Sequence, residues 1–193
     1  MSILSFKQEL LRKGIHACNS IIAFSLFFLD HNNVLLIVGV TGTIIVVFDF
    51  LRIYTKSVRS IYNYFFKKVT RDFESHRLTG ASYVMIGSLV VLTFFESRIC
   101  IPALLIMSFS DSAAAIIGKK YGKTKIFNKT LEGSFAFLIT SFIIVIFFIP
   151  DIDFTFSMIA ILVSTIVELM PKSNLDDNLL IPIVSAFIIS LGG

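Results

Sequence analysis

Charged residues and cysteines are both scarce in this sequence. Charged side chains make up 16% of the 193 residues, against roughly 25% in ordinary soluble domains, so water is not the main solvent of this chain. The two cysteines, Cys18 and Cys100, lie in different apolar segments and lack the spacing of metal ligands. We therefore expect both to be packing residues.

The sequence also lacks a Ser/Gly-rich linker, a low-complexity tract and a clear internal repeat. Nothing divides residues 1–193 into separate domains, and we expect one integral membrane domain. The basic residues are scattered at the ends of apolar runs instead of being gathered on one polar region. This scatter argues against a nucleic acid partner despite the net charge of +4.

Apolar segments, by contrast, recur along the whole chain, and hydrophobic residues make up 55% of it. Most segments approach the roughly 17–25 residues that cross a bilayer, and each span must be helical because lipid offers no partner to open backbone groups. We therefore predict an all-α, polytopic membrane helix bundle of about seven transmembrane helices, or six if the short end segments do not span. The segments are 15–29, 34–51, 79–95, 99–117, 131–149, 154–170 and 179–192.

The distribution of Lys and Arg predicts the orientation of this bundle. Placing the N-terminus in the cytoplasm leaves Arg98 as the one external residue among the 17 basic ones. We therefore expect a multi-pass protein of a prokaryotic plasma membrane, with the Lys119–Lys129 loop in the cytoplasm and Asp151 outside. The stretch 56–71 alternates basic and aromatic residues, and we expect it to lie in the cytoplasmic interface as an amphipathic helix.

A polar stripe leads into the first apolar segment. Glu9, Arg12, Lys13 and His16 have the spacing that places side chains on one face of a helix. One interpretation is an interfacial ion pair with cations that reach toward the membrane surface. The other is a phosphate-binding Arg/Lys pair that is oriented by the carboxylate, with His16 deeper along the same stripe.

Asp49, Asp111 and Glu168 lie inside apolar segments, where an ionisable residue is costly and indicates a functional site. Asp49 has a structural explanation, because Arg52 follows three residues later and can pair with it. Asp111 has no cation within its own segment, and Glu168 has only Lys172 near it. Asp111 therefore needs a metal ion or a cation from elsewhere in the fold.

The stretch from Asp111 to Phe137 holds the densest set of candidate residues. We expect Gly118 and Gly122 to break the span, with five lysines in the loop before Glu132 and Gly133 open the next helix. Basic side chains beside glycine backbone and a helix N-terminus favour anionic oxygens, and a carboxylate such as that of Glu132 can hold Mg²⁺ against them. Anchoring of the cytoplasmic loop by positive charge is the simpler explanation for several of these lysines.

A last polar group, Glu168 with Asp176, Asp177 and Asn178, surrounds another cytoplasmic connection. These residues either cap a helix or bring oxygen ligands to the side of the lysine-rich loop.

Four motifs together resemble the family of dolichol kinase, phytol kinase and CTP-dependent diacylglycerol kinase. They are ELLRKGIH near the start, LTGASYVMIG at 78–87, the pair DSAAAIIGKKYGK and NKTLEGS, and VELMPKSNLDDNLLIP near the end. Part of the central block, K-T-x-E-G, is also similar to phosphatidate cytidylyltransferases, whereas R-K-x-x-H favours the kinases. The resemblance implies CTP as phosphoryl donor and a divalent metal such as Mg²⁺.

A mechanism consistent with these residues is in-line transfer of the γ-phosphoryl group to the hydroxyl of a long-chain lipid alcohol that enters from the bilayer. Asp111 then binds metal or accepts the proton, His16 is the competing proton acceptor, and Lys129 contacts phosphate at the reacting centre. The residues expected to bind the nucleotide and its phosphates are Arg12, Lys13, Gly118, Lys119, Gly122, Thr130 and Gly133. Glu132 and Asp177 are further candidate metal ligands. The residues expected to support this site are Glu9, Thr79, Gly80, Glu168 and Asn178.

Two other functions fit the same residues. A cytidylyltransferase would join the nucleotide to the lipid and release pyrophosphate, whereas the kinase releases CDP. An ion-coupled transporter would bind its ion at Asp111 and Glu168 and need no nucleotide. Among acceptors, phytol, a polyprenol and diacylglycerol all fit an apolar groove.

Overall fold

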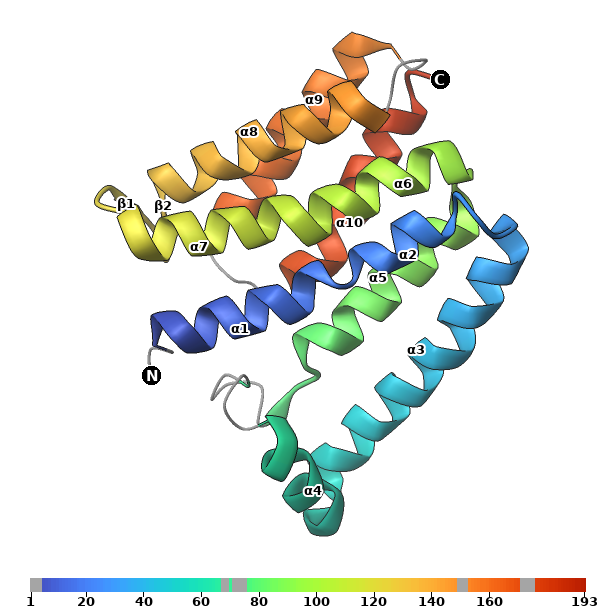
Figure 1. The fold of residues 1–193 in the computed structure, drawn as a ribbon, viewed down its shortest axis with the longest axis vertical. Helices are drawn as coiled ribbons and strands as arrows, with labels where there is room; N and C mark the ends of the chain where they lie inside the picture. Colours follow the sequence, from blue (N-terminus) through green and yellow to red (C-terminus); the bar gives the residue numbers. More distant parts are fainter. Residues whose placement is uncertain (1–4, 67–69, 71–75, 149–152, 171–175) are drawn as a thin grey trace.

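The computed structural model describes residues 5–66, 70, 76–148, 153–170 and 176–193. This part of the chain is almost entirely helical, as predicted (Figure 1). The helices are α1 (Phe6–Ala17), α2 (Ser20–Ser25), α3 (His31–Tyr54), α4 (Lys56–Phe66), α5 (Gly80–Phe94), α6 (Ser97–Leu105), the π-helical turn η2 (Ile106–Ser110), α7 (Asp111–Tyr121), α8 (Leu131–Phe148), α9 (Phe154–Leu169) and α10 (Asp177–Ser190).

Three helical stretches in the described residues are long and apolar enough to cross a membrane: α3, the continuous run from α6 through α7, and α8. The 24 residues of α3 rise about 36 Å, which exceeds the ~30 Å of bilayer hydrocarbon. Helices α5, α9 and α10 are apolar but shorter. The chain is therefore an all-α membrane protein, and the count of seven spans stays a prediction.

The first predicted segment, 15–29, is not one continuous helix. Ser5 begins α1 with a capping box, in which its hydroxyl accepts from the Gln8 amide and the Gln8 side chain accepts from the Ser5 amide. Helix α1 then ends at Ala17, and α2 begins at Ser20. The expectation that Cys18 packs internally is wrong, because it occupies the exposed break between the two helices.

The run from α6 through α7 forms the centre of the bundle, and 78% of its apolar stretch is buried against neighbouring helices. Small and hydroxyl-bearing residues let these helices approach closely, as is usual between helices in membranes. Ser141 on α8 donates to Ser110 at 2.9 Å, and Ser164 on α9 pairs with Ser185 on α10 at 2.8 Å. Cys100 lies in this core, as expected.

The lysine-rich loop contains a short antiparallel ribbon, which the all-α prediction omits. Strands β1 (Lys125–Ile126) and β2 (Lys129–Thr130) pair across a tight turn at Phe127, whose φ of 53° lies in the left-handed region. The ribbon connects α7 to α8.

The prediction that Gly118 breaks the span is also wrong. Helix α7 continues through Gly118 to Tyr121, and Gly122 is the residue that ends it. Gly118 is instead a point of close approach between α7 and α8. A Cβ there would lie 2.7 Å from the Thr130 hydroxyl and 3.4 Å from the Gly133 Cα.

The elements that carry most of the basic residues lie at one end of the molecule. Figure 1 shows the N-terminus and the β1–β2 ribbon at this end and the C-terminus at the opposite end. Helix α4 follows α3 and covers residues 56–66 of the predicted amphipathic segment, with none of them fully buried. Most of the segment's remaining residues lie outside the described part of the chain, as do Asp151 and Lys172.

Candidate functional site

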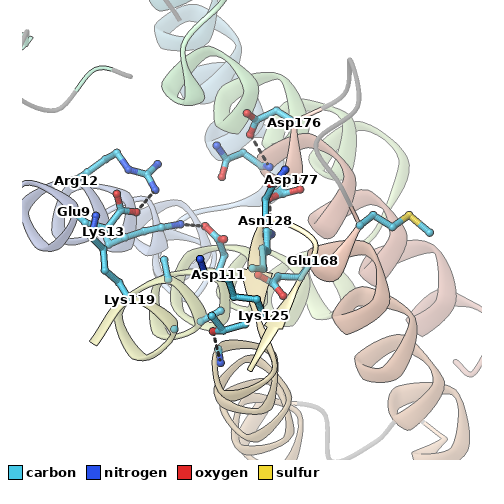
Figure 2. Close-up of a pocket in the computed structure, with 18 residues that line it drawn as sticks. Glu9, Arg12, Lys13, Asp111, Lys119, Lys125, Asn128, Glu168, Asp176 and Asp177 are labelled. Atoms are coloured by element: carbon cyan, nitrogen blue, oxygen red, sulfur yellow. Dashed lines mark hydrogen bonds and ion pairs between the residues drawn. The ribbon is translucent and has the colours of Figure 1, made fainter. Parts of the chain in front are cut away.

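A cavity of about 460 Å³ lies at the end of the bundle that carries the N-terminus and the β1–β2 ribbon (Figure 2). Five helices (α1, α7, α8, α9 and α10) and the ribbon supply its lining. The charged residues that line it are Glu9, Arg12, Lys13, Asp111, Lys119, Lys125, Lys129, Glu168, Asp176 and Asp177. Most of the residues singled out from the sequence as candidate site residues therefore meet in one place.

Asp111 occupies the first position of α7, directly after the π-helical turn η2, and its exposure is 6%. Its carboxylate forms an ion pair with Lys13 of α1, which is 4% exposed. The cation that the sequence did not supply within this span thus comes from the N-terminal helix. Short π-helical turns often occur at functional sites.

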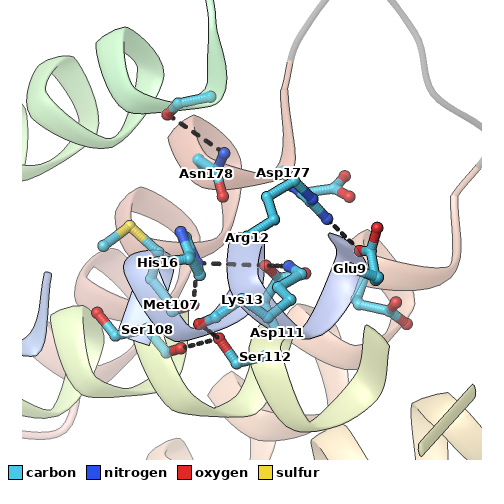
Figure 3. Close-up of polar contacts among 12 residues, drawn as sticks. Glu9, Arg12, Lys13, His16, Met107, Ser108, Asp111, Ser112, Asp177 and Asn178 are labelled. Carbon is cyan, nitrogen blue, oxygen red and sulfur yellow. Dashed lines mark hydrogen bonds and ion pairs between the residues drawn. The ribbon is translucent and has the colours of Figure 1, made fainter. Parts of the chain in front are cut away.

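His16, one turn after Lys13 on α1, contacts the same carboxylate. Its Nε2 lies 3.2 Å from the Asp111 carboxylate and 3.0 Å from the carbonyl oxygen of Met107 (Figure 3). The Ser112 hydroxyl donates to the Lys13 carbonyl at 3.3 Å, which joins α7 to α1 again. The stripe on α1 therefore faces α7, as its spacing predicted.

Arg12 forms an ion pair with Glu9 on the same face of α1. Both side chains line the cavity, together with Lys119 from the last turn of α7. Their positions are compatible with both interpretations of the stripe, a local ion pair and a phosphate site.

A second charged cluster joins the ribbon to α9 and α10. The ammonium of Lys129, on β2, lies 2.9 Å from the Glu168 carboxylate and 2.8 Å from that of Asp177. Ser134 on α8 donates to the other oxygen of Glu168 at 2.9 Å. Burial lowers the pKa of Lys129, but the two carboxylates outweigh it, so the pKa lies above the ordinary value and the ammonium stays charged at neutral pH.

The predicted glycines bring backbone close to this cavity. Gly118 and Gly133 line it, and a Cβ at Gly133 would lie 2.8 Å from the Ala114 carbonyl oxygen. The hydroxyl of Thr130 accepts from the Gly133 amide at 3.2 Å, which fixes the start of α8. Gly122 does not line the cavity, and it packs against Thr130.

Glu132 lies outside the cavity lining. Its carboxylate accepts from the backbone amide of Thr124 at 3.1 Å and so ties the start of α8 to the residues that precede β1. Glu132 was predicted as a metal ligand together with Asp177, but Asp177 lines the cavity and Glu132 does not.

The start of α10 contributes both a cap and a cavity wall. Asp176 accepts from the Asn178 amide at 3.0 Å, as in a helix cap, and Asp176, Asp177 and Asn178 all line the cavity. The amide group of Asn178 donates to the Gly80 carbonyl at 3.4 Å, which links α10 to α5. The two interpretations of this sequence are therefore compatible.

Thr79 and the buried Asp49 form a separate node. The Asp49 carboxylate accepts from the Thr79 amide at 2.6 Å and from the hydroxyls of Thr79 at 3.0 Å and Ser82 at 2.7 Å. Arg52 donates to the other carboxylate oxygen at 2.7 Å, as its spacing predicted. Asp49 thus ties the start of α5 to α3.

Several cavity residues were not selected from the sequence. Lys125 and Asn128 lie in the ribbon, and Ser134, outside the lining, donates a hydrogen bond to the lining residue Glu168. Lys125 stood among five lysines without a distinguishing neighbour. The serine had no signal either, because hydroxyl-bearing residues are frequent in the apolar helices for packing reasons.

No group of three or more His, Cys, Asp or Glu side chains in the described residues is placed to hold a metal ion without further ligands. Glu168 and Asp177 do converge, on the ammonium of Lys129. Mg²⁺ commonly binds one or two carboxylates together with substrate phosphates and water. The residues therefore fit a metal that arrives with a polyphosphate better than a resident one.

The chain is thus an all-α membrane protein whose cavity is lined by paired lysines and carboxylates. No family model matches the chain, and no solved structure matches it. The CTP-dependent diacylglycerol kinase 1 of Schizosaccharomyces pombe is 30% identical to it, over 97% of this chain and 94% of the relative. The chain therefore belongs to the lipid kinase family that contains this enzyme.

Two other relatives agree with this membership. The CTP-dependent diacylglycerol kinase 1 of Saccharomyces cerevisiae is 26% identical over 95% of this chain and 73% of its own length. The probable phytol kinase 1 of Oryza sativa is 29% identical over 93% of this chain and 63% of its own length. All three alignments cover nearly all of this chain.

Proposed function

We propose that this protein is a CTP-dependent lipid kinase that transfers the γ-phosphoryl group of CTP to the hydroxyl of a long-chain lipid alcohol at the cytoplasmic face of a membrane. The observation that carries the proposal is the meeting of Lys13, Asp111 and Lys129, from three separate parts of the sequence, around one cavity. The names of the relatives supply the nucleotide and the lipid class.

The charge of the cavity favours a polyphosphate that comes with a cation. Five of its described lining residues are cationic and five are acidic, so the lining is close to neutral. A triphosphate carries several negative charges, and a neutral lining does not balance them by itself. A divalent ion bound between the phosphates and Asp177 or Glu168 would supply the missing positive charge.

The chain's own residues divide the remaining work. Lys129, Lys119 and Arg12 contact phosphate oxygens, and Gly118 and Gly133 let α7 and α8 pack closely at the wall of the cavity. Asp111 and His16 stand beside one another as the candidate acceptors of the hydroxyl proton. The reaction forms a bond between the lipid oxygen and the γ-phosphorus, breaks the bond to the β–γ bridging oxygen, and releases CDP.

The experiment is an incubation of the purified protein with CTP labelled at the γ-phosphate and, separately, with a panel of lipid alcohols and with phosphatidate, with and without Mg²⁺. We expect label in a lipid monophosphate, equimolar CDP, and loss of both on chelation of the metal. Release of pyrophosphate with cytidine in the lipid product would instead identify a cytidylyltransferase. Absence of any nucleotide turnover would favour the ion-coupled transporter.

The cytoplasmic orientation has its own test at Lys123, an exposed residue that precedes the ribbon. A Lys123→Cys variant in a Cys18→Ala background should react with a membrane-impermeant thiol reagent in inverted vesicles and stay unlabelled in intact cells. Labelling in intact cells would place the cavity on the external side.

A further inference from the structure

A second cavity, of about 450 Å³, lies between α1, α3, α4 and α5. Its walls are mainly apolar and include Ile44 and Phe48 of α3, Phe66 of α4 and Val84 of α5. This volume lies within the range of roughly 300–1,000 Å³ that is usual for small-molecule sites. The residues that gave rise to the proposed function do not explain why this space exists.

The cavity reaches the surface of the protein on the side of α3. Ile44 is 63% exposed, Phe48 38% and Phe66 45%. Helix α3 is the least buried of the three long apolar helices, with 22% of its apolar stretch covered, so most of its surface faces the hydrocarbon. An apolar chain can therefore pass from the bilayer into the cavity without crossing water.

The inner end of this second cavity adjoins the first, charged cavity. Arg12 and Asn178 line both cavities. His16 lines the apolar cavity, Asp111 lines the charged one, and the two side chains are 3.2 Å apart. His16 and Asp111 thus lie at the boundary between the two cavities. They are the two groups that the proposed function makes candidate acceptors of the hydroxyl proton.

The polar groups that line the second cavity differ in how fully their hydrogen bonds are made within the protein. Asp49 also lines it, but its carboxylate is satisfied by Arg52, Thr79 and Ser82. Asn19 contacts His16 at 3.5 Å and Asn178 contacts the Gly80 carbonyl at 3.4 Å, both long for hydrogen bonds. The amides at the inner end are therefore better able to bind an incoming hydroxyl than the carboxylate is.

We propose that the second cavity binds the hydroxyl end of the lipid alcohol, whose chain leaves past Ile44 and Phe48 into the bilayer. The inference rests on the proposed function. It adds an acceptor site made by α1, α3, α4 and α5, and it orders the two candidate groups: the hydroxyl meets His16 first, and Asp111 lies beyond it on the phosphate side. Tyr62 and Phe66 of α4 form a further wall of this site.

The test narrows the cavity at Ala81, a small exposed residue of α5 that lines it. The Ala81→Phe variant should raise the KM for the lipid acceptor about tenfold or more and leave the KM for CTP within about twofold, because the ring competes with one substrate only. Val47→Phe is the matched control, since Val47 is 51% exposed on α3 and outside the cavity. Dioctanoylglycerol and phytol serve as separate acceptors, which distinguishes a glycerolipid from an isoprenoid alcohol.

Two further measurements keep the outcome unambiguous. Ile44→Trp blocks the same cavity from α3 and replaces Ala81→Phe if that variant is recovered in low yield. A lipid alcohol with a diazirine near its hydroxyl should label peptides from α3 and α5 in the wild-type protein. If the wild type is active, either of two results overturns the acceptor site. One is a KM for the lipid acceptor that is the same in Ala81→Phe and Ile44→Trp as in Val47→Phe. The other is labelling of peptides outside α3 and α5. A wild type that phosphorylates no lipid alcohol, including a polyprenol, overturns the proposed function instead.

Discussion

Asp49 and Asp111 are both buried carboxylates in apolar helices, with exposures of 3% and 6%, yet their surroundings differ. Asp49 accepts from an arginine on its own helix and from a backbone amide and two hydroxyls on α5. Asp111 instead meets two ionisable groups from a distant part of the chain, at the edge of a charged cavity. Depth in the membrane is thus a poor guide to function until the partners of the carboxylate are known.

The largest effect is expected at Asp111. Asp111→Asn removes the charge beside Lys13 and His16, and turnover should fall about 10²–10⁴-fold if the carboxylate acts in the reaction. Because the variant also removes the charge that pairs with the buried Lys13, we expect less folded protein in the membrane.

The double variant Asp111→Asn/Lys13→Met separates these two effects. Removal of the Lys13 ammonium should restore the amount of folded protein, measured by size-exclusion chromatography of the detergent extract, while CTP-dependent phosphorylation stays absent. Recovery of activity along with the protein would mean that Asp111 is a structural partner like Asp49.

Lys129 should come next. Lys129→Met removes an ammonium that Glu168 and Asp177 hold beside the proposed phosphate site, and turnover should fall about 100-fold, as on removal of a donor to a transition-state oxyanion. Lys129→Arg should recover little of the loss, since a planar guanidinium does not fit the place of a compact ammonium. Single-turnover rates at saturating CTP measure this effect, and unchanged rates in Lys129→Met would leave the lysine only an anchoring role.

Asp49→Asn should affect stability far more than catalysis. It leaves the buried guanidinium of Arg52 without its carboxylate, a change that typically costs about 3–5 kcal/mol. The thermal midpoint in detergent should drop, whereas activity per folded molecule, assayed below that midpoint, should stay within about threefold of wild type. A selective loss of turnover at an unchanged midpoint would show that Asp49 acts in the reaction and remove its contrast with Asp111.

The smallest effect is expected at Glu132. Its carboxylate contacts the Thr124 amide and lies outside the cavity, so Glu132→Gln should retain both activity and the dependence on Mg²⁺. Titration of activity against free Mg²⁺ compares the variant with Asp177→Asn, which should require a higher concentration. A shift for Glu132→Gln as large as that for Asp177→Asn would return Glu132 to the metal site.

Patterns within single helices were predictable from the sequence. The stripe from Glu9 to His16, the Asp49–Arg52 pair and the amphipathic start of α4 all depend on spacing along one helix, and spacing survives folding. The need of Asp111 for a distant cation followed from the cost of an unpaired charge in an apolar span.

Contacts between distant segments were not predictable in the same way. Nothing in the sequence identifies Lys13 as the partner of Asp111. Nothing in it indicates either that Glu132 contacts Thr124 and does not join Asp177 in the cavity lining. Gly118 was misjudged because a glycine can end a helix or let two helices touch, and only the position of α8 distinguishes the two. The break at Cys18 likewise lacks a proline or glycine to announce it.

The π-helical turn before Asp111 sets the rotational phase of α7 relative to α6. Such a turn amounts to one extra residue in an α-helix, and one residue corresponds to about 100° of rotation around the helix axis. Deletion of one residue within Ile106–Ser110 would therefore turn Asp111 away from Lys13 and His16 without changing any side chain of the cavity. The direction in which Asp111 points is thus encoded in the backbone of five residues that do not line the cavity themselves.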